Sequence, residues 1–559
     1  MSTVPSQPHR GQSPLYASRT LFMIAALATL VIAVSCGTAK MGGQVTGKRA
    51  ESPMYASQAR DGKAAKPSPS PKSESMKERI ASEEEFNTEE YDSIKENEFL
   101  DAQKNPLSTF SADVDTASYS NLRRFITQGQ MPPKGSVRIE EMMNYFTYEY
   151  PQPGNDAPFS FTTELAACPW NAANRLLLIG LQAKKIPVEQ MPPTNLVFLL
   201  DVSGSMNQAN KLPLLKSAFK LLVNQMRAKD RVAIVVYAGA AGVVLPSTPG
   251  DRKDLILDTL ENLQAGGSTA GGAGIQLAYN VAQENFLPNG NNRVVLATDG
   301  DFNVGPSSND ELEQMIVEKR KTGIYLTVLG FGMGNYKDAK MEKIADKGNG
   351  NFAYIDTIHE ARKVLVQEMG ATLLTIAKDV KIQAEFNPAR VKAYRLVGYE
   401  NRLMRAEEFN DDRKDAGELG SGHTVTVLYE IVPVGGPTNV PGTDPLKYQA
   451  SSLTDAAKSG NEIMTLKFRY KPPKSDQSIL ITTPVSSAEV QPGKESANLR
   501  YAAAVAEFGM LLRDSPFKGS ATYADVMERA KKAQGPDSEG YRAEFIRMVG
   551  MAKTISGKE

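Results

Sequence analysis

The sequence predicts an α/β protein in which a doubly wound, mostly parallel sheet is inserted into a β-sandwich-like domain and followed by a C-terminal helical segment. Across residues 191–375, short apolar runs of strand length alternate with segments of helical periodicity, which is typical of parallel strands with helices on both faces. Period-two alternation occurs on both sides of this region, in 159–183 and in 376–490, so these stretches are expected to complete one sandwich. Residues 491–559 place apolar side chains at helical spacing.

Residues 1–36 of this 559-residue chain are expected to be a targeting segment. Arg10 and Arg19 precede an apolar run at 21–34, which is too short for a membrane span and suits the core of a signal peptide. The run ends in Ile-Ala-Val-Ser-Cys, which resembles the lipobox of bacterial lipoproteins. This resemblance implies that Cys36 is acylated, and the alternatives are an ordinary cleaved signal and an uncleaved anchor.

Two segments follow before the central region. Residues 37–95 are poor in large aliphatic side chains and rich in Ser, Pro, Lys and Glu, so we expect a disordered linker that tethers the folded part to a membrane. Residues 96–190 begin with helical periodicity, as in Val137–Phe146, and continue with strand alternation that supplies the first part of the sandwich. Cys168 lies in this second segment and is expected to be a small buried side chain rather than a reactive thiol.

Asp113 and Asp115 share one face if residues 107–119 are extended. Their spacing resembles the nucleophile and acid pair of haloacid-dehalogenase-type phosphatases. A buried apolar strand should precede such a pair, whereas Ser and Thr residues precede this one. A second cation site and the capping of a helix at Tyr119–Ile126 are the alternatives, and capping is the interpretation that we prefer.

In the central region, one predicted strand ends in three oxygen-bearing side chains. Leu196–Leu200 is an uninterrupted apolar run, and Asp201, Ser203 and Ser205 follow it at alternate positions. At the carboxyl end of a parallel strand, such side chains converge in the crevice where open α/β sheets bind ligands. One carboxylate and two hydroxyls suit a hard cation, Mg²⁺ or Mn²⁺, better than zinc.

Two later stretches supply further oxygen donors. Thr269 lies in a glycine-rich loop, 266–272, ahead of a predicted helix, and Asp299 ends another apolar strand, 293–298. The order Asp-Val-Ser-Gly-Ser, then Thr after Gly-Gly-Ser, then Thr-Asp-Gly resembles the metal-ion-dependent adhesion site of von Willebrand factor type A (VWA) domains. The alternative is that these are ordinary turn and capping residues.

The VWA resemblance implies a Rossmann-like fold for the central region and a role for each donor. Ser203, Ser205 and Thr269 would coordinate Mg²⁺ directly. Asp201 and Asp299 would act directly or through water and orient the hydroxyls. One coordination position would stay open for a Glu or Asp carboxylate from a protein partner.

Composition and a wider resemblance limit the function. Lys plus Arg and Asp plus Glu both number 64, so the formal net charge is zero and nothing indicates a nucleic-acid-binding face. Only three His and two Cys are present, which supplies few groups for a zinc site or a Cys–His nucleophile, so no catalytic residues are expected. The segment Phe110–Tyr119, the VWA-like region and the C-terminal region follow one another as in the YfbK-like bacterial lipoproteins, which residues 97–555 resemble. This resemblance implies a cell-envelope location and a divalent cation, and it supplies no reaction.

We therefore expect a lipoprotein anchored in the bacterial envelope, facing the periplasm, that binds a protein partner through Mg²⁺. The residue after Cys36 is Gly37, which is a weak indication of the outer membrane. Two alternatives remain open. One is a structural envelope protein whose metal site is idle, and the other is a hydrolase that uses a cation-activated water or the pair Asp113 and Asp115.

Overall fold

The computed structural model describes most of the chain from residue 89 onward. The described residues are 89, 91–112, 115–154, 157–268, 271–300, 309–333, 337–414, 416–437, 440 and 452–557. The chain divides into two units, Met1–Arg79 and Ile80–Glu559, and every described residue belongs to the second. The predicted signal segment, Cys36 and most of the predicted linker therefore lie outside the described residues. No helix in the described part has both the length and the apolar character needed to cross a membrane.

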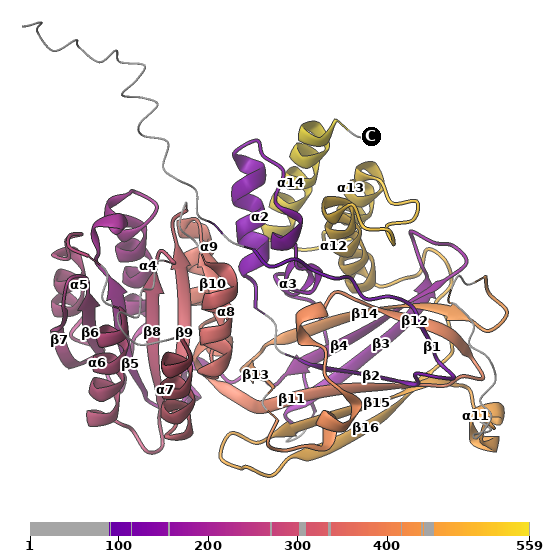
Figure 1. The fold of residues 1–559 in the computed structure, drawn as a ribbon, viewed down its shortest axis with the longest axis horizontal. Coiled ribbons are helices and arrows are strands. Elements are labelled where there is room, and N and C mark those ends of the chain that lie inside the picture. The colour runs from indigo at the N-terminus through magenta and orange to yellow at the C-terminus, as the bar shows by residue number, and fades with distance from the viewer. Residues whose placement is uncertain are drawn as a thin grey trace, which may run out of the picture. The chain divides into compact units, whose positions relative to one another are not determined.

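The central region contains a six-stranded sheet (Figure 1). Five strands are parallel and one edge strand is antiparallel to its neighbour, as expected for a doubly wound α/β domain. The strands lie in the order β10 (Phe352–Ile355), β9 (Ile324–Phe331), β8 (Asn291–Thr298), β5 (Thr194–Asp201), β6 (Arg231–Tyr237) and β7 (Ala241–Pro249), with β7 as the antiparallel edge.

Helices cover both faces of this sheet because successive residues of a central strand point to opposite sides. On β5, Leu196 and Phe198 belong to one buried cluster, whereas Val197 and Leu199 belong to another. The first cluster includes residues of α4 (Leu212–Gln225), α5 (Lys253–Glu261), α9 (Ile358–Arg362) and α10 (Met369–Leu373), with a π-helical turn at Lys363–Gln367. The second includes residues of α6 (Gly271–Glu284), α7 (Asn309–Lys321) and α8 (Asp338–Lys347).

Two antiparallel sheets form a sandwich from strands on both sides of the central region. The first has the order β1 (Leu100–Asp101), β12 (Val391–Val397), β14 (Thr424–Pro433), β4 (Arg175–Ala183) and β3 (Phe159–Ala167). The second has the order β13 (Gly417–Gly420), β11 (Thr375–Phe386), β15 (Glu462–Lys471) and β16 (Ile479–Ser486), with β2 (Leu107–Ser111) also pairing with β11. Both sheets contribute to one buried cluster, in which the rings of Phe386 and Tyr394 stack at 3.9 Å. The predicted insertion of the central domain into a sandwich is therefore confirmed.

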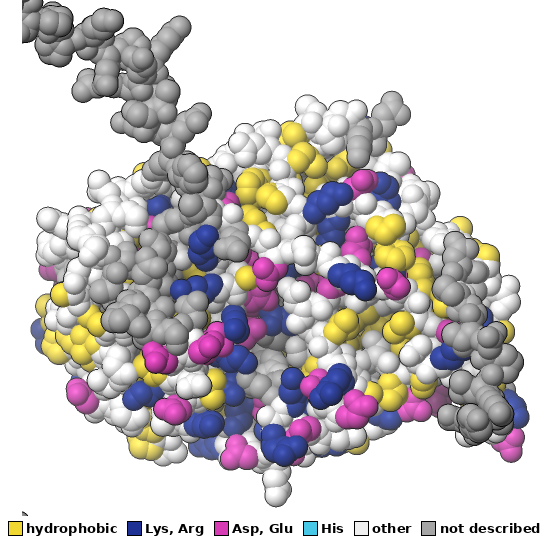
Figure 2. Space-filling model, in the orientation of Figure 1, with side chains coloured by type: hydrophobic (Ala, Val, Ile, Leu, Met, Phe, Trp, Pro, Cys, Tyr) yellow, Lys and Arg dark blue, Asp and Glu magenta, His cyan; other side chains and the backbone are white. Residues whose placement is uncertain are grey.

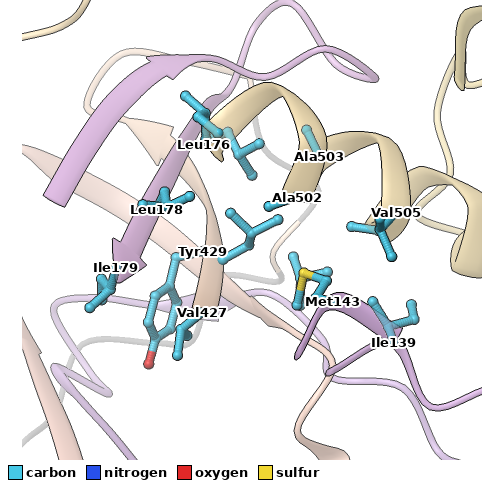
Figure 3. Close-up of a cluster of buried hydrophobic side chains, with 14 of the residues drawn as sticks. Ile139, Met143, Leu176, Leu178, Ile179, Val427, Tyr429, Ala502, Ala503 and Val505 are labelled. Atoms are coloured by element: carbon cyan, nitrogen blue, oxygen red, sulfur yellow. The ribbon is translucent and has the colours of Figure 1, made fainter. Parts of the chain in front are cut away.

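A group of helices packs on the β4 and β14 side of this sandwich. Figure 3 shows Leu178 of β4, Tyr429 of β14 and three helical side chains, Met143, Ala502 and Val505, in one apolar cluster. The helices are α2 (Ala117–Thr127), α3 (Ile139–Asn144), α12 (Ala497–Arg513), α13 (Tyr523–Lys532) and α14 (Tyr541–Ser556). The remaining short helices are α11 (Asp455–Ser459) and the 3₁₀ turns at Lys134–Ser136, Val188–Gln190, Gly204–Asn207, Glu400–Arg402 and Ala406–Asn410.

Buried ion pairs join α2 and the turn before α3 to the central domain. Arg123 binds both Asp356 and Glu360, at the start of the last helical stretch of that domain. Arg138 pairs with Asp338 at the start of α8. Because all of these side chains are almost fully buried, each charge depends on its partner for stabilisation.

Candidate metal site

The end of β5 and the loop after it bring one carboxylate and two hydroxyls to the carboxyl edge of the parallel sheet. Asp201 is the last residue of β5 and is fully buried. Its Oδ1 accepts a hydrogen bond from the backbone N–H of Ser203 at 2.9 Å, which turns the chain sharply. The hydroxyls of Ser203 and Ser205 lie 3.0 Å apart, with Ser203 buried and Ser205 exposed to solvent. The predicted alternate spacing therefore produces a row of oxygens that leads from the core to the surface.

Two residues of neighbouring strands hold the second oxygen of Asp201. Tyr237, the last residue of β6, donates to Oδ2 at 3.1 Å, and Thr298, the last residue of β8, donates at 3.2 Å. Burial, together with the nearby negative charge of Asp299, raises the pKa of Asp201 to about 6, although hydrogen bonds from Ser203 and Tyr237 oppose the shift. Sequence reasoning did not identify Tyr237 or Thr298 as donors to Asp201.

Asp299 follows β8 and is fully buried. It lies close enough to Asp201 for its negative charge to raise the pKa of that carboxyl group. The ammonium group of Lys211 donates to Asp299 Oδ2 at 3.1 Å, and both side chains of this ion pair are buried. Lys211 is a further residue that sequence reasoning missed. Its signal in the sequence was a lone lysine directly before the apolar face of α4, a few residues after the serines.

The glycine-rich loop ahead of α6 is tied to the serine loop by backbone hydrogen bonds. The N–H of Gly266 donates to Val202 O at 2.8 Å, and the N–H of Gly204 donates to Gly267 O at 3.0 Å. Gly267 has a φ of +85°, which side chains rarely adopt, so a glycine is needed where the two loops meet. Thr269 lies outside the described residues, and its place among the donors stays a prediction.

The donor set fits a hard divalent cation. Among the described residues, no group of three or more His, Cys, Asp and Glu side chains could hold a metal ion. Ser203, Ser205 and Asp299 supply oxygen ligands of the kind that Mg²⁺ and Mn²⁺ prefer. Both oxygens of Asp201 already accept hydrogen bonds, which suits a residue that orients the serines and meets the cation through water.

Asp115 joins separate elements of the fold through two hydrogen bonds. Its Oδ1 accepts a hydrogen bond from the N–H of Phe352 at 2.8 Å, and its Oδ2 accepts one from Arg402 at 3.0 Å. It therefore connects the start of α2 to β10 and to the loop after β12. Asp115 is not the N-cap residue of α2, because Thr116 holds that position and Glu141 accepts from the N–H of Ser118 in the first turn, whereas capping by Asp113 stays a prediction. Asp113 lies outside the described residues.

Cys168 is buried, and burial raises the pKa of its thiol well above the usual range. A thiol with a raised pKa is a poor nucleophile because little thiolate forms. This agrees with the prediction of a small buried side chain.

Family comparisons match three consecutive parts of the chain. The profile of the von Willebrand factor type A domain matches residues 195–367, and one described as von Willebrand factor matches 85–178. A third, described as "Uncharacterized protein YfbK, C-terminal", matches 371–555. The fold and these matches define a protein with a VWA domain. The chain is also 42% identical over 476 residues to YfbK of Escherichia coli K12, across 84% of this chain and 82% of that protein. It therefore belongs to the YfbK family.

Other matches are more distant. The human inter-alpha-trypsin inhibitor heavy chain H4 is 29% identical over 178 residues, which are 30% of this chain and 18% of that protein. Among solved structures, a von Willebrand factor type A protein from Catenulispora acidiphila is 16% identical, with a TM-score of 0.39, and is matched over 72% of this chain and 91% of that chain.

Proposed function

We propose that this protein is an envelope-anchored binding protein whose VWA domain holds Mg²⁺ at the edge of its sheet and takes a carboxylate from a protein partner. The observation that carries the proposal is the pair of serine hydroxyls 3.0 Å apart, one buried and one exposed, beside two buried acids. Bound Mg²⁺ would supply the positive charge that attracts a carboxylate oxygen. Mn²⁺ would serve in the same way.

The arrangement of the site supports an external ligand. Asp201 and Asp299 approach from the core, where neither can meet a partner, whereas Ser205 faces solvent. Near-octahedral coordination of Mg²⁺ requires more oxygens than these side chains provide, so a position on the solvent side is left for water or a partner's Asp or Glu.

The surface and the N-terminal sequence support a protein partner at a membrane. On the face drawn in Figure 2, Lys and Arg side chains are interspersed with Asp and Glu, whereas nucleic acid is bound by basic surfaces. Acylation of Cys36 and a flexible linker over 37–95 would hold the domain at the membrane and let it reach partners in the periplasm.

Substitution of Asp201 by Ala tests the proposal. The full-length protein, purified in detergent, is titrated with Mg²⁺ by calorimetry and is used to capture proteins from membranes with and without EDTA. We expect that wild type binds Mg²⁺ and captures a partner only without EDTA. In Asp201→Ala, both the Mg²⁺ affinity and the amount of captured partner should fall by at least about tenfold, because the serines lose the residue that orients them.

Asp258→Ala is the matched control, because Asp258 is exposed on α5 of the same domain. It should behave as wild type. Equal Mg²⁺ affinity and equal capture by wild type and Asp201→Ala would contradict the proposal. A loss of thermal stability alone, with capture unchanged, would favour a structural protein with an idle site.

A further inference from the structure

The Lys211 side chain reaches Asp299 of the candidate metal site through the space beside Gly332, which has no side chain. Lys211 immediately precedes α4, whose first backbone N–H bond, from Leu215, is accepted by Lys211 O. Its carbon chain passes Gly332, which follows β9 and has a φ of +77°. A Cβ added at Gly332 would lie 2.4 Å from Lys211 Cε and 2.5 Å from Cγ, so any side chain there would displace the lysine.

Further contacts fix the two ends of this path. Tyr354 of β10 donates a hydrogen bond to the backbone oxygen of Gly332, which holds the turn beside the lysine. At the other end, the ammonium group binds Asp299 Oδ2 at 3.1 Å. Only 4% of the Lys211 side chain and none of the Asp299 side chain is exposed, so water and salt screen this charge weakly.

We propose that Lys211 is a resident positive charge of the metal site that selects an anionic ligand. The two carboxylates of Asp201 and Asp299 together balance the charge of one divalent cation. The buried ammonium group of Lys211 then leaves the loaded site with an excess of positive charge. A carboxylate from a partner neutralises this excess, whereas water or a neutral amide does not.

The same charge weakens the binding of the metal itself. Mg²⁺ must bind beside the positive charge of Lys211 and must share Asp299 with it. Lys211 therefore lowers the affinity for the cation and raises the affinity for the anion. Without metal, the lysine serves as a counter-ion of a fully buried carboxylate. A lysine that only filled space would produce neither effect.

The inference rests on the proposed binding of a divalent cation, and Lys211→Met tests it because methionine keeps most of the aliphatic length and removes the charge. Calorimetry on the full-length protein measures Mg²⁺ binding in chloride buffer, and again in acetate buffer of equal ionic strength. For Lys211→Met we expect Mg²⁺ to bind about tenfold more tightly than in wild type in chloride. Replacing chloride by acetate should increase the Mg²⁺ affinity of wild type. The increase should be several-fold smaller for Lys211→Met, because the variant lacks the excess positive charge that attracts acetate.

Thermal unfolding supplies a second readout. Without Mg²⁺, Lys211→Met should melt at a lower temperature than wild type, and Mg²⁺ should raise its melting temperature by more than that of wild type. Lys211→Gln, which is also neutral but can still hydrogen-bond Asp299, is used if Lys211→Met does not fold. Lys220→Met is the matched control, because Lys220 lies on α4 and pairs with Glu261 on the surface.

The outcomes separate this inference from the proposed function. If wild type binds neither Mg²⁺ nor Mn²⁺, the proposed function fails and this inference fails with it. If wild type binds Mg²⁺ and the neutral variants match it in affinity and acetate response, Lys211 is a packing residue and only this inference is overturned. If the neutral variants bind both Mg²⁺ and acetate more weakly, the lysine supports the fold of the site, and the inference is likewise overturned.

Discussion

The chemistry of the site depends on residues that hold its carboxylates from behind. Tyr237 and Thr298 both donate to one oxygen of Asp201, and Lys211 pairs with Asp299. Such supporting groups determine which oxygen lone pairs point at a cation and how much charge remains there. Their contribution should be measurable without altering any of the predicted metal ligands.

Tyr237→Phe should weaken Mg²⁺ binding by about tenfold, because it removes one of the donors that orient Asp201 while keeping the buried ring. Calorimetric titration of the full-length protein measures the change. The control is Tyr279→Phe on α6, where the hydroxyl is buried and has no hydrogen-bond partner among the described residues. The prediction is wrong if both variants bind Mg²⁺ as wild type does.

Among the elements, α12 and α3 show how closely the helices pack on the sandwich. Gly509, in the middle of α12, faces Ile139 of α3, and a Cβ added there would lie 2.8 Å from Ile139 Cγ1 and 3.3 Å from Met142 Sδ. The two helices therefore approach at a distance that only a glycine allows. The sequence predicted an apolar face on α12 but could not show that a glycine on it was needed for packing.

Gly509→Ala should lower the free energy of unfolding by about 1–2 kcal/mol, because overpacking between the helices outweighs the gain in helix propensity. Urea denaturation of the full-length protein measures it. Gly550→Ala on α14 is the matched control, since the nearest atom to its new Cβ is Met527 Cε at 3.7 Å. That variant should be stabilised by about 0.5–1 kcal/mol. Stabilisation in both would show that α12 and α3 separate at little cost.

For the described part of the chain as a whole, one arginine connects three parts that are far apart in sequence. Arg123 of α2 binds Asp356 and Glu360 at the end of the VWA domain, and also Glu544 of α14. The hydroxyl of Tyr145 donates to Glu360 at 2.7 Å. Because these acids are largely buried, the arginine is their main source of charge compensation.

Arg123→Met should destabilise the protein by about 3–5 kcal/mol, because it leaves buried carboxylates without their counter-ion. Thermal and urea unfolding measure this effect. Lys134→Met is the control, because Lys134 forms a long, 3.9 Å pair with Asp514 in which both side chains are at least half exposed. It should change the stability by less than about 1 kcal/mol. A small effect at Arg123 would mean that apolar contacts and other ion pairs, such as Arg138 with Asp338, hold the three parts together without it.

The sequence by itself determined the architecture and the positions of the candidate oxygen donors. Apolar runs and their periods predicted the parallel sheet, the interrupted sandwich and the C-terminal helices. Asp201, Ser203, Ser205 and Asp299 were predicted because each lies at or just beyond the end of a strand, and the ends of parallel strands meet at one edge of a sheet. These are local patterns, and they can be recognised without knowing which distant residues come together.

Only the tertiary structure decided which distant side chains complete these patterns. The pairing of Lys211 with Asp299, the support of Asp201 by Tyr237 and the use of Asp115 as a connection rather than a cap all depend on contacts between separate elements. A lysine before a helix or a tyrosine at a strand end has many possible partners in the sequence. A buried polar group cannot bind water instead, so the fold determines which side chain becomes its hydrogen-bond or ion-pair partner.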